Sequence, residues 1–161
     1  RAARMTVKEF DLDINVVFRS EFLRRWHIYR PPTYFVWVKR QGLLLWGKNY
    51  LSEVREEEIT AESLYKRAVD LAQSSRAVYL NDKDAMFWEN KYASWLRELV
   101  GGVLYLHGTL ELDFHLCSQI LSGLSPEIGQ HLVPLREERL AIETVSGIAE
   151  ALVEYIHTKF I

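Results

Sequence analysis

The feature that most constrains the fold is the helical spacing of apolar residues from Thr60 to the end of the chain. Apolar side chains three and four positions apart lie on one face of an α-helix, where they can be buried together. The Thr60 hydroxyl suits the start of the first helix, because it can accept a hydrogen bond from a free backbone N–H group. The buried face of this predicted helix consists of Leu64, Ala68, Leu71, Ala72, Val78 and Tyr79.

A second helix is predicted after Asn81 and Asp82, with Gly101 and Gly102 inside its apolar stripe. Two glycines in a helix cost about 2 kcal/mol relative to alanine, so we expect another helix to cross closely there. The apolar residues of this stripe are Met86, Phe87, Trp95, Leu96, Leu99, Val100, Val103 and Leu104.

Three further helices complete the pattern. A shorter apolar helix follows Gly108 and runs through Leu124, and Ser125 is placed to cap a brief helix with Pro126 at its first position. The last helix is predicted from Arg136 to Ile161 and is buried through Leu140, Val145, Ile148, Ala149, Leu152 and Ile156. We therefore expect a mainly α fold, an up-and-down bundle of about four or five antiparallel helices, as a domain over residues 59–161.

The preceding segment, residues 1–52, has a different organisation. Polar and apolar residues alternate between positions 9 and 18, which predicts a half-buried strand. This alternation puts Asp11 and Asp13 on one face, where two carboxylates can share a divalent cation. The competing interpretation is a solvated strand face whose acids have no ligand.

A helix is predicted next, because TYFVWVKRQ follows the prolines at 31 and 32. Its β-branched and aromatic residues would also suit a strand. We expect the helix to stop at Gly42 in the left-handed cap conformation, and LLLWG, ending at Gly47, to form a short strand.

The order of acidic strand, basic linker, proline-initiated helix, glycine and LLLWG resembles nucleotidyltransferases of the DNA polymerase β superfamily, closest to the kanamycin-type and small antitoxin-type members. The resemblance covers the first third of the chain. It implies a sheet on which three carboxylates hold the Mg²⁺ ions that bridge the nucleotide phosphates, followed by a helical domain. It also aligns Asp11 or Asp13 with the third carboxylate, as metal ligand and catalytic residue.

The chain departs from the family pattern in one respect: no glycine-serine turn precedes Asp11. A second alignment makes DLDINVV the first acid pair, but it leaves no acid-bearing strand between Phe18 and Pro31 for the third carboxylate. Under either alignment the catalytic set is incomplete. We therefore expect a carboxyl-terminal piece of a longer protein, inactive alone and without tight Mg²⁺ binding.

A basic stretch offers phosphate contacts beside aromatic stacking surfaces, for a nucleotide or, with less support, RNA. Its basic residues are Arg19, Arg24, Arg25, His27, Arg30, Lys39 and Arg40, interleaved with Trp26, Tyr29 and Trp37, and the predicted phosphate contacts among them are Arg19, Arg24, Arg25, Lys39 and Arg40. The competing interpretation pairs these cations with local acids such as Glu21 and Glu53 and buries the tryptophans.

The bundle also resembles HEPN helical domains found beside such nucleotidyltransferases. Ribonucleases among them carry an arginine and a histidine four to six residues apart on one helix. Here Arg97 and His107 lie too far apart to match, so we do not expect ribonuclease activity. His107, His115 and Cys117 lack the spacing for metal capture from one helix, and Cys117 is predicted to be a small buried thiol.

Two functional classes follow. In the first, the chain belongs to a nucleotidyltransferase that uses a nucleoside triphosphate and an unknown acceptor, and the bundle recognises the acceptor or forms a homodimer. In the second, the bundle is an interaction module without catalysis. The net charge of −2 is too small to indicate a nucleic-acid or membrane partner, and no apolar run is long enough to span a bilayer, so we expect a cytoplasmic protein.

Overall fold

The computed structural model describes residues 4–7, 12–15, 32–44, 46–54, 56–81, 85–137 and 139–161. Two strands, β1 (Arg4–Val7) and β2 (Leu12–Asn15), are described through their backbones. They pair antiparallel, with Thr6 opposite Asp13. The other described elements are helical, so the prediction of a mainly α fold is confirmed. The assignment of residues 1–52 to a nucleotidyltransferase sheet stays a prediction.

Helix α2 (Pro32–Gln41) begins at a proline, as predicted. The helix ends at Gln41, directly before Gly42, as predicted, and the Gly42 N–H donates to the Val38 carbonyl at 2.8 Å. Gly42 is not in the predicted left-handed conformation, which occurs instead at Gly47, with a φ of 94°. The short strand expected at LLLWG is also wrong for its described residues, which lie in coil and bend. A strand needs a partner for its backbone groups, and no described strand pairs with this segment.

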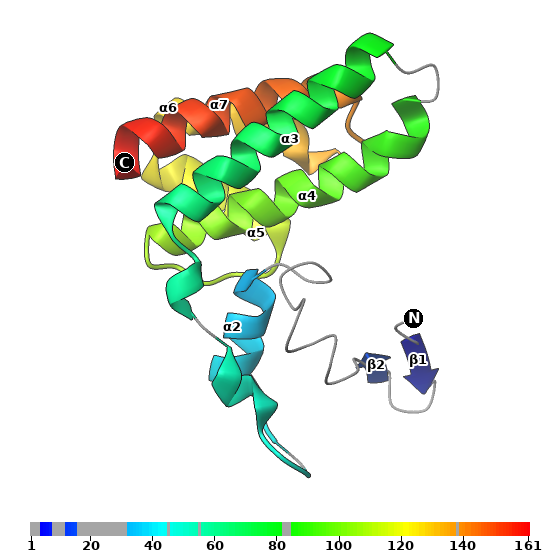
Figure 1. Ribbon diagram of the computed structural model, residues 1–161, viewed down its shortest axis with the longest axis vertical. Helices are drawn as coiled ribbons and strands as arrows, with labels where there is room; N and C mark the ends of the chain where they lie inside the picture. The colour runs from blue at the N-terminus through cyan, green and yellow to red at the C-terminus, as the bar shows by residue number, and fades with distance from the viewer. Residues whose placement is uncertain are drawn as a thin grey trace.

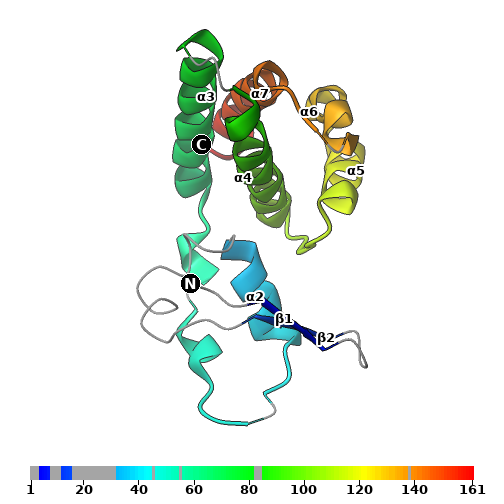
Figure 2. The ribbon, with the colours of Figure 1, turned by 90° about the vertical axis from the view of Figure 1, so that its right-hand side faces the viewer.

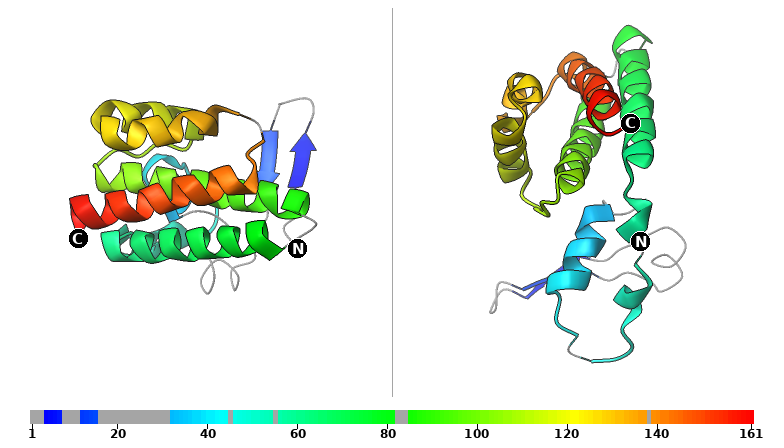
Figure 3. Two further views of the ribbon diagram at one scale, coloured as in Figure 1. Left: turned by 90° about the horizontal axis from the view of Figure 1, so that it is seen from above. Right: turned by 90° about the vertical axis from the view of Figure 1, so that its left-hand side faces the viewer.

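Three long helices, α3 (Ala61–Asn81), α4 (Ala85–Leu106) and α7 (Ile142–Phe160), form the body of the bundle. They lie side by side in Figure 1 and in the view from above in Figure 3. Because the connection is short, α4 runs antiparallel to α3. The last helix also runs antiparallel to α3, since Arg76 binds Glu150 at 3.3 Å and the earlier Tyr65 contacts the later His157.

Helices α5 (Phe114–Leu124) and α6 (Pro126–Leu132) form a short pair beside this body (Figure 2), followed by a 3₁₀ turn at Val133–Arg136. The helix predicted from Arg136 therefore begins six residues later, at Ile142. Leu140, predicted to lie in that helix, is buried at 1% exposure in the connection before it.

Local hydrogen bonds fix several of the helix ends. The Ser63 N–H donates to the Thr60 hydroxyl at 3.2 Å, so the predicted cap of α3 is confirmed. Gly108 adopts a φ of 83° after the last turn of α4, a conformation that favours glycine. Ser125 does precede α6, but its hydroxyl makes no capping bond and instead pairs with the Tyr155 hydroxyl.

The predicted close crossing occurs at one of the two glycines of α4. A Cβ placed on Gly102 would lie 2.7 Å from Leu64 Cδ2 of α3, whereas on Gly101 its nearest neighbours, Cys117 Sγ and Thr33 Oγ1, would be 3.9 Å away. The absent side chain at position 102 therefore lets α3 approach α4.

One core joins these elements. Its buried apolar side chains come from α2 and from the connection to α3, including Val54 and Ile59, as well as from the bundle helices. Within the described ranges, no helix has the length and apolar character that crossing a membrane requires.

Candidate functional site

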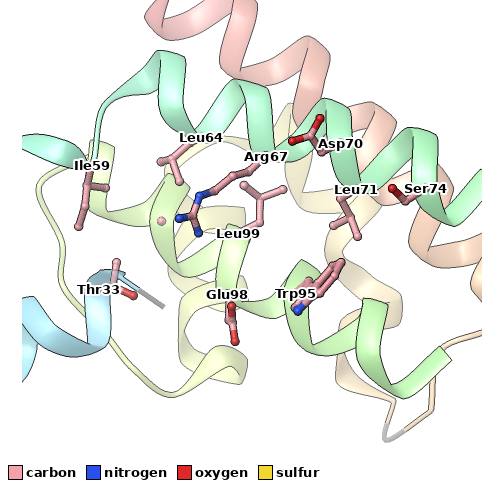
Figure 4. Close-up of a pocket in the computed structure, with 11 residues that line it drawn as sticks. Thr33, Ile59, Leu64, Arg67, Asp70, Leu71, Ser74, Trp95, Glu98 and Leu99 are labelled. Carbon is pink, nitrogen blue, oxygen red and sulfur yellow. The ribbon is translucent and has the colours of Figure 1, made fainter. Parts of the chain in front are cut away.

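A pocket of about 430 Å³ lies where α3 and α4 cross. Figure 4 shows its two helical walls, with Thr33 of α2 and Ile59 at one end. We call it the α3–α4 pocket. Its volume is near the lower end of the range of about 300–1,000 Å³ that is typical of small-molecule sites. A compact ligand would therefore be enclosed by the helices.

The two walls follow from helical spacing. Leu64, Arg67, Leu71 and Ser74 recur at intervals of three and four along α3, so they share one face of that helix. Trp95, Glu98, Leu99 and Gly102 do the same along α4. Each wall thus contains buried core leucines, such as Leu64 and Leu99, beside more accessible side chains, such as Arg67 and Trp95.

The floor of the pocket is apolar. Leu71 and Leu99 face each other across the crossing and are 3% and 4% exposed, and Ile59 is 6% exposed. An apolar group placed here would gain about 25 cal/mol for each Å² of apolar surface removed from water. The floor therefore favours the carbon skeleton of a ligand over its charged groups.

Arg67 brings a positive charge into this apolar surrounding. Its side chain is half-buried, and in Figure 4 it reaches from α3 toward the space between Thr33 and Glu98. Among the described residues no carboxylate lies within ion-pair distance of Arg67. A guanidinium presents several N–H donors in a planar fork that matches a carboxylate or a phosphate. Arg67 is therefore a ready anchor for an anionic group.

The rim carries acids and an aromatic ring. Asp70 from α3 and Glu98 from α4 line the pocket together with Trp95. Trp95 is 44% exposed, and Lys91 Nζ lies 4.8 Å from the centre of its ring. The described lining residues include one cation, Arg67, and two carboxylates, Asp70 and Glu98.

The predicted phosphate-binding residues Lys39 and Arg40 occur in a different environment. Lys39 Nζ donates to the Val54 carbonyl at 2.9 Å and lies 3.5 Å from Glu56 Oε1. The Arg40 guanidinium binds the other oxygen of Glu56, and the Tyr105 hydroxyl donates to that same oxygen at 3.2 Å. This cluster ties α2 to the turn before α3 and to α4.

The charges of the cluster stabilise one another. The hydrogen bond from Arg40 lowers the pKa of Glu56, and the same bond raises the pKa of Arg40. Burial, followed by the negative charge of Glu56, raises the pKa of Tyr105. Any phosphate bound by Lys39 and Arg40 would compete with Glu56.

The remaining predicted site residues are not brought together by the described structure. Asp11, Arg19, Arg24 and Arg25 lie outside the described residues, and Asp13 is described through the backbone of β2. The prediction of a Mg²⁺ site at Asp11 and Asp13 therefore stays a prediction. Within the described residues, no three histidine, cysteine or acidic side chains cluster as a metal site would require.

Cys117 is a buried thiol, as predicted. It is 1% exposed, and burial, with the nearby charges of Glu111 and Asp113, raises its pKa to about 11. Because the thiolate is the reactive form, this cysteine is a poor nucleophile in the folded protein.

A second polar cluster lies near the C-terminal ends of α4 and α7. His107 Nε2 lies 2.8 Å from the Tyr155 hydroxyl, which also contacts the Ser125 hydroxyl at 2.5 Å. Burial, followed by the charge of Lys159, lowers the pKa of His107. Ser125 and Tyr155 are 5% and 6% exposed, so we interpret this cluster as a buried network that fixes α7 to the α5–α6 junction.

Sequence reasoning did not identify the α3–α4 pocket. The available signal was Arg67, a charged residue three positions after Leu64 and four before Leu71, and therefore on the buried face of the helix. The helical spacing predicts that Trp95 and Leu99 are both buried; Leu99 is, at 4% exposure, but Trp95 is 44% exposed at the pocket rim.

Comparison of the chain with models of known protein families, with curated proteins and with solved structures finds no match in any of the three.

Proposed function

We propose that the chain is the carboxyl-terminal part of a nucleotidyltransferase-like protein and that its helical bundle recognises the acceptor substrate in the α3–α4 pocket. The observation that carries this proposal is the half-buried Arg67, without a carboxylate partner among the described residues, above an apolar floor. Thr33 also lines this pocket, so the helix that follows the acid-bearing strand in the sequence reaches the same site.

The proposed reaction is in-line attack by an acceptor hydroxyl on the α-phosphate of a nucleoside triphosphate. Mg²⁺ held by Asp11 or Asp13, together with acids from outside this chain, would neutralise the phosphate charge. The bundle contributes by positioning the acceptor, because fixing two reactants in the right geometry removes much of the entropic cost of their encounter. We expect no transfer by this chain alone, since one carboxylate cannot hold two metal ions.

Calorimetric titration tests the nucleotide half of the proposal. Mg²⁺ and each of a set of nucleoside triphosphates would be titrated into the wild-type chain, the Asp11→Asn variant and the Asp13→Asn variant. The proposal predicts weak binding by the wild type that is lost in one of the two variants. Equal heats in all three proteins, or none in any, would contradict a metal-dependent nucleotide site.

A specific observation also favours the second candidate function, an interaction module. The segment after α2 exposes Leu43 at 82%, Leu44 at 51% and Trp46 at 93%, although apolar side chains of this size are usually covered. A partner protein or a second copy of the chain could bury them. Sedimentation velocity of the wild type and a Trp46→Ser variant distinguishes a second copy of the chain from a different partner protein. Self-association through this segment predicts a concentration-dependent dimer that the variant loses.

A further inference from the structure

We infer that the α3–α4 pocket binds an amphipathic monocarboxylate, a small molecule with one carboxylate group and an apolar body. The inference rests on the proposed function in one respect: it names the chemical class of the acceptor. Its basis is the placement of the lining side chains along the pocket. In Figure 4, the Arg67 guanidinium and Thr33 lie toward one end. Leu71 and Trp95 lie toward the other end, with Leu99 between.

The first step concerns Arg67. Helical side chains lean toward the N-terminus of their helix, and in Figure 4 the Arg67 side chain runs back along α3 toward Leu64. It is half-buried and forms no ion pair with the described carboxylates. A ligand carboxylate would accept two parallel hydrogen bonds from the guanidinium and would replace the water that a partly buried cation has given up. A carboxylate is therefore the expected partner for this side chain.

The second step concerns Thr33, which lines the pocket from α2 and is 4% exposed. Its hydroxyl forms no hydrogen bond with the described residues. A Cβ placed on Gly101 would lie 3.9 Å from this oxygen, and one placed on Gly102 would lie 2.7 Å from Leu64 Cδ2. Thr33 and the first turns of α3 therefore approach the same turn of α4. A buried hydroxyl without a partner costs free energy, and donating to a ligand carboxylate would offset that cost.

The third step concerns the body of the ligand. Leu71 and Leu99 form the floor, and Trp95 presents an exposed ring at the rim. An aliphatic chain or an aromatic ring would be buried against these leucines and would contact the indole. The pocket volume of about 430 Å³ accommodates a phenyl ring with a short chain, together with some water. A ligand with its charge at one end and apolar surface at the other therefore matches the pocket along its length.

The test is isothermal calorimetry on the full chain without Mg²⁺ or nucleotide. The probes are 3-phenylpropionate, its neutral amide, which keeps the shape but lacks the charge, and acetate, which keeps the charge but lacks the apolar body. We expect 3-phenylpropionate to bind at least about tenfold more tightly than either of the other probes. A hydrogen bond between charged groups and the burial of a phenyl ring are each worth about a factor of ten or more.

Protein variants locate the site. Arg67→Gln should abolish the preference for 3-phenylpropionate over its amide. Thr33→Val, which replaces the hydroxyl by a methyl group, should weaken 3-phenylpropionate binding by about threefold to tenfold, whereas Thr33→Ser, which keeps the hydroxyl, should not. Asp70→Asn, which removes a carboxylate from the lining, should not weaken it either. Arg76→Gln is the matched control, because Arg76 lies on the same helix but pairs with Glu150 outside the pocket. Circular dichroism confirms that each variant is folded.

The outcomes are distinct. Equal affinity for 3-phenylpropionate and its amide would overturn the inference in favour of a purely apolar site, and equal affinity for acetate would overturn it in favour of a simple anion site. Binding of none of the probes, an unchanged preference in Arg67→Gln or weaker binding in Asp70→Asn would also overturn it. Because nucleotide is absent, carboxylate binding without any response in the Mg²⁺ titration would refute the proposed transferase and leave the pocket assignment intact. Nucleotide binding without carboxylate binding would do the reverse.

Discussion

Substitution of the two adjacent glycines of α4 by alanine should have opposite effects on stability. In a helix interior, alanine is favoured over glycine by about 1 kcal/mol. At Gly101 the new methyl group would have neighbours no closer than 3.9 Å, which is ordinary van der Waals contact. Gly101→Ala should therefore raise the free energy of unfolding by up to about 1 kcal/mol.

At Gly102 the same backbone gain is opposed by overpacking. The new methyl would lie 2.7 Å from Leu64 Cδ2 and 3.3 Å from its Cδ1. Leu64 is 3% exposed, so it can yield only by disturbing its packing or by turning into the α3–α4 pocket. Overpacking of a core costs about 1–3 kcal/mol. After subtraction of the backbone gain, Gly102→Ala should lower the free energy of unfolding by about 0–2 kcal/mol.

Urea denaturation followed by circular dichroism measures this difference. The helix-propensity contribution cancels between the two variants, so Gly102→Ala should be less stable than Gly101→Ala by about 1–3 kcal/mol. In a Leu64→Val background, which removes a methylene group at the contact, the difference should shrink. Equal midpoints and slopes for both glycine variants would refute the close approach of α3 and α4 at Gly102.

Three further predictions concern the buried polar groups. Tyr155→Phe should lower the free energy of unfolding by about 1–3 kcal/mol, because the Ser125 hydroxyl and the His107 ring nitrogen lose a shared partner; a loss below about 0.5 kcal/mol in urea denaturation would contradict the network. Burial lowers the pKa of His107 below its usual 6.5, so the unfolded chain binds the proton at a higher pH than the folded protein does. The stability is therefore full above the unfolded pKa and is lost as the pH falls below it toward the lower folded pKa. Urea midpoints across that range should fall less steeply in His107→Gln, and parallel curves would exclude His107 as the cause. Cys117, with a pKa of about 11, should react with a thiol reagent at neutral pH only after denaturation, and rapid labelling of the folded protein would show that the thiol is accessible.

The elements that could be predicted from sequence depend on contacts between near neighbours in the chain. The position of α3 followed from the spacing of its apolar residues and from Thr60, whose capping partner Ser63 is three residues away. The burial of Cys117 followed in the same way from the apolar residues on either side of it in the chain. Helical periodicity and capping are local, so a single sequence carries them.

The errors arose where a distant partner decided the outcome. Ser125 has the residue type and the position of a helix cap, but Tyr155, thirty residues later, takes its hydroxyl. Phosphate binding by Lys39 and Arg40 stays a prediction, but the sequence did not indicate that Glu56, in the turn before α3, pairs with both. In each case the same side chain has a local and a long-range partner available, and only the packing of the helices selects between them.

The sequence by itself determined approximately where the helices of the bundle lie and most of their buried residues, because hydrophobic spacing within a helix requires no knowledge of the rest of the fold. Tyr79, predicted to be buried, is an exception at 49% exposure. Only the tertiary structure decided that Arg67 faces a pocket instead of solvent and that Trp95 stands at its rim. The pocket exists because Gly102 admits Leu64 and sets how α3 crosses α4. That crossing joins residues far apart in the chain, such as Leu64 and Gly102, and local patterns contain no information about which pairs will meet.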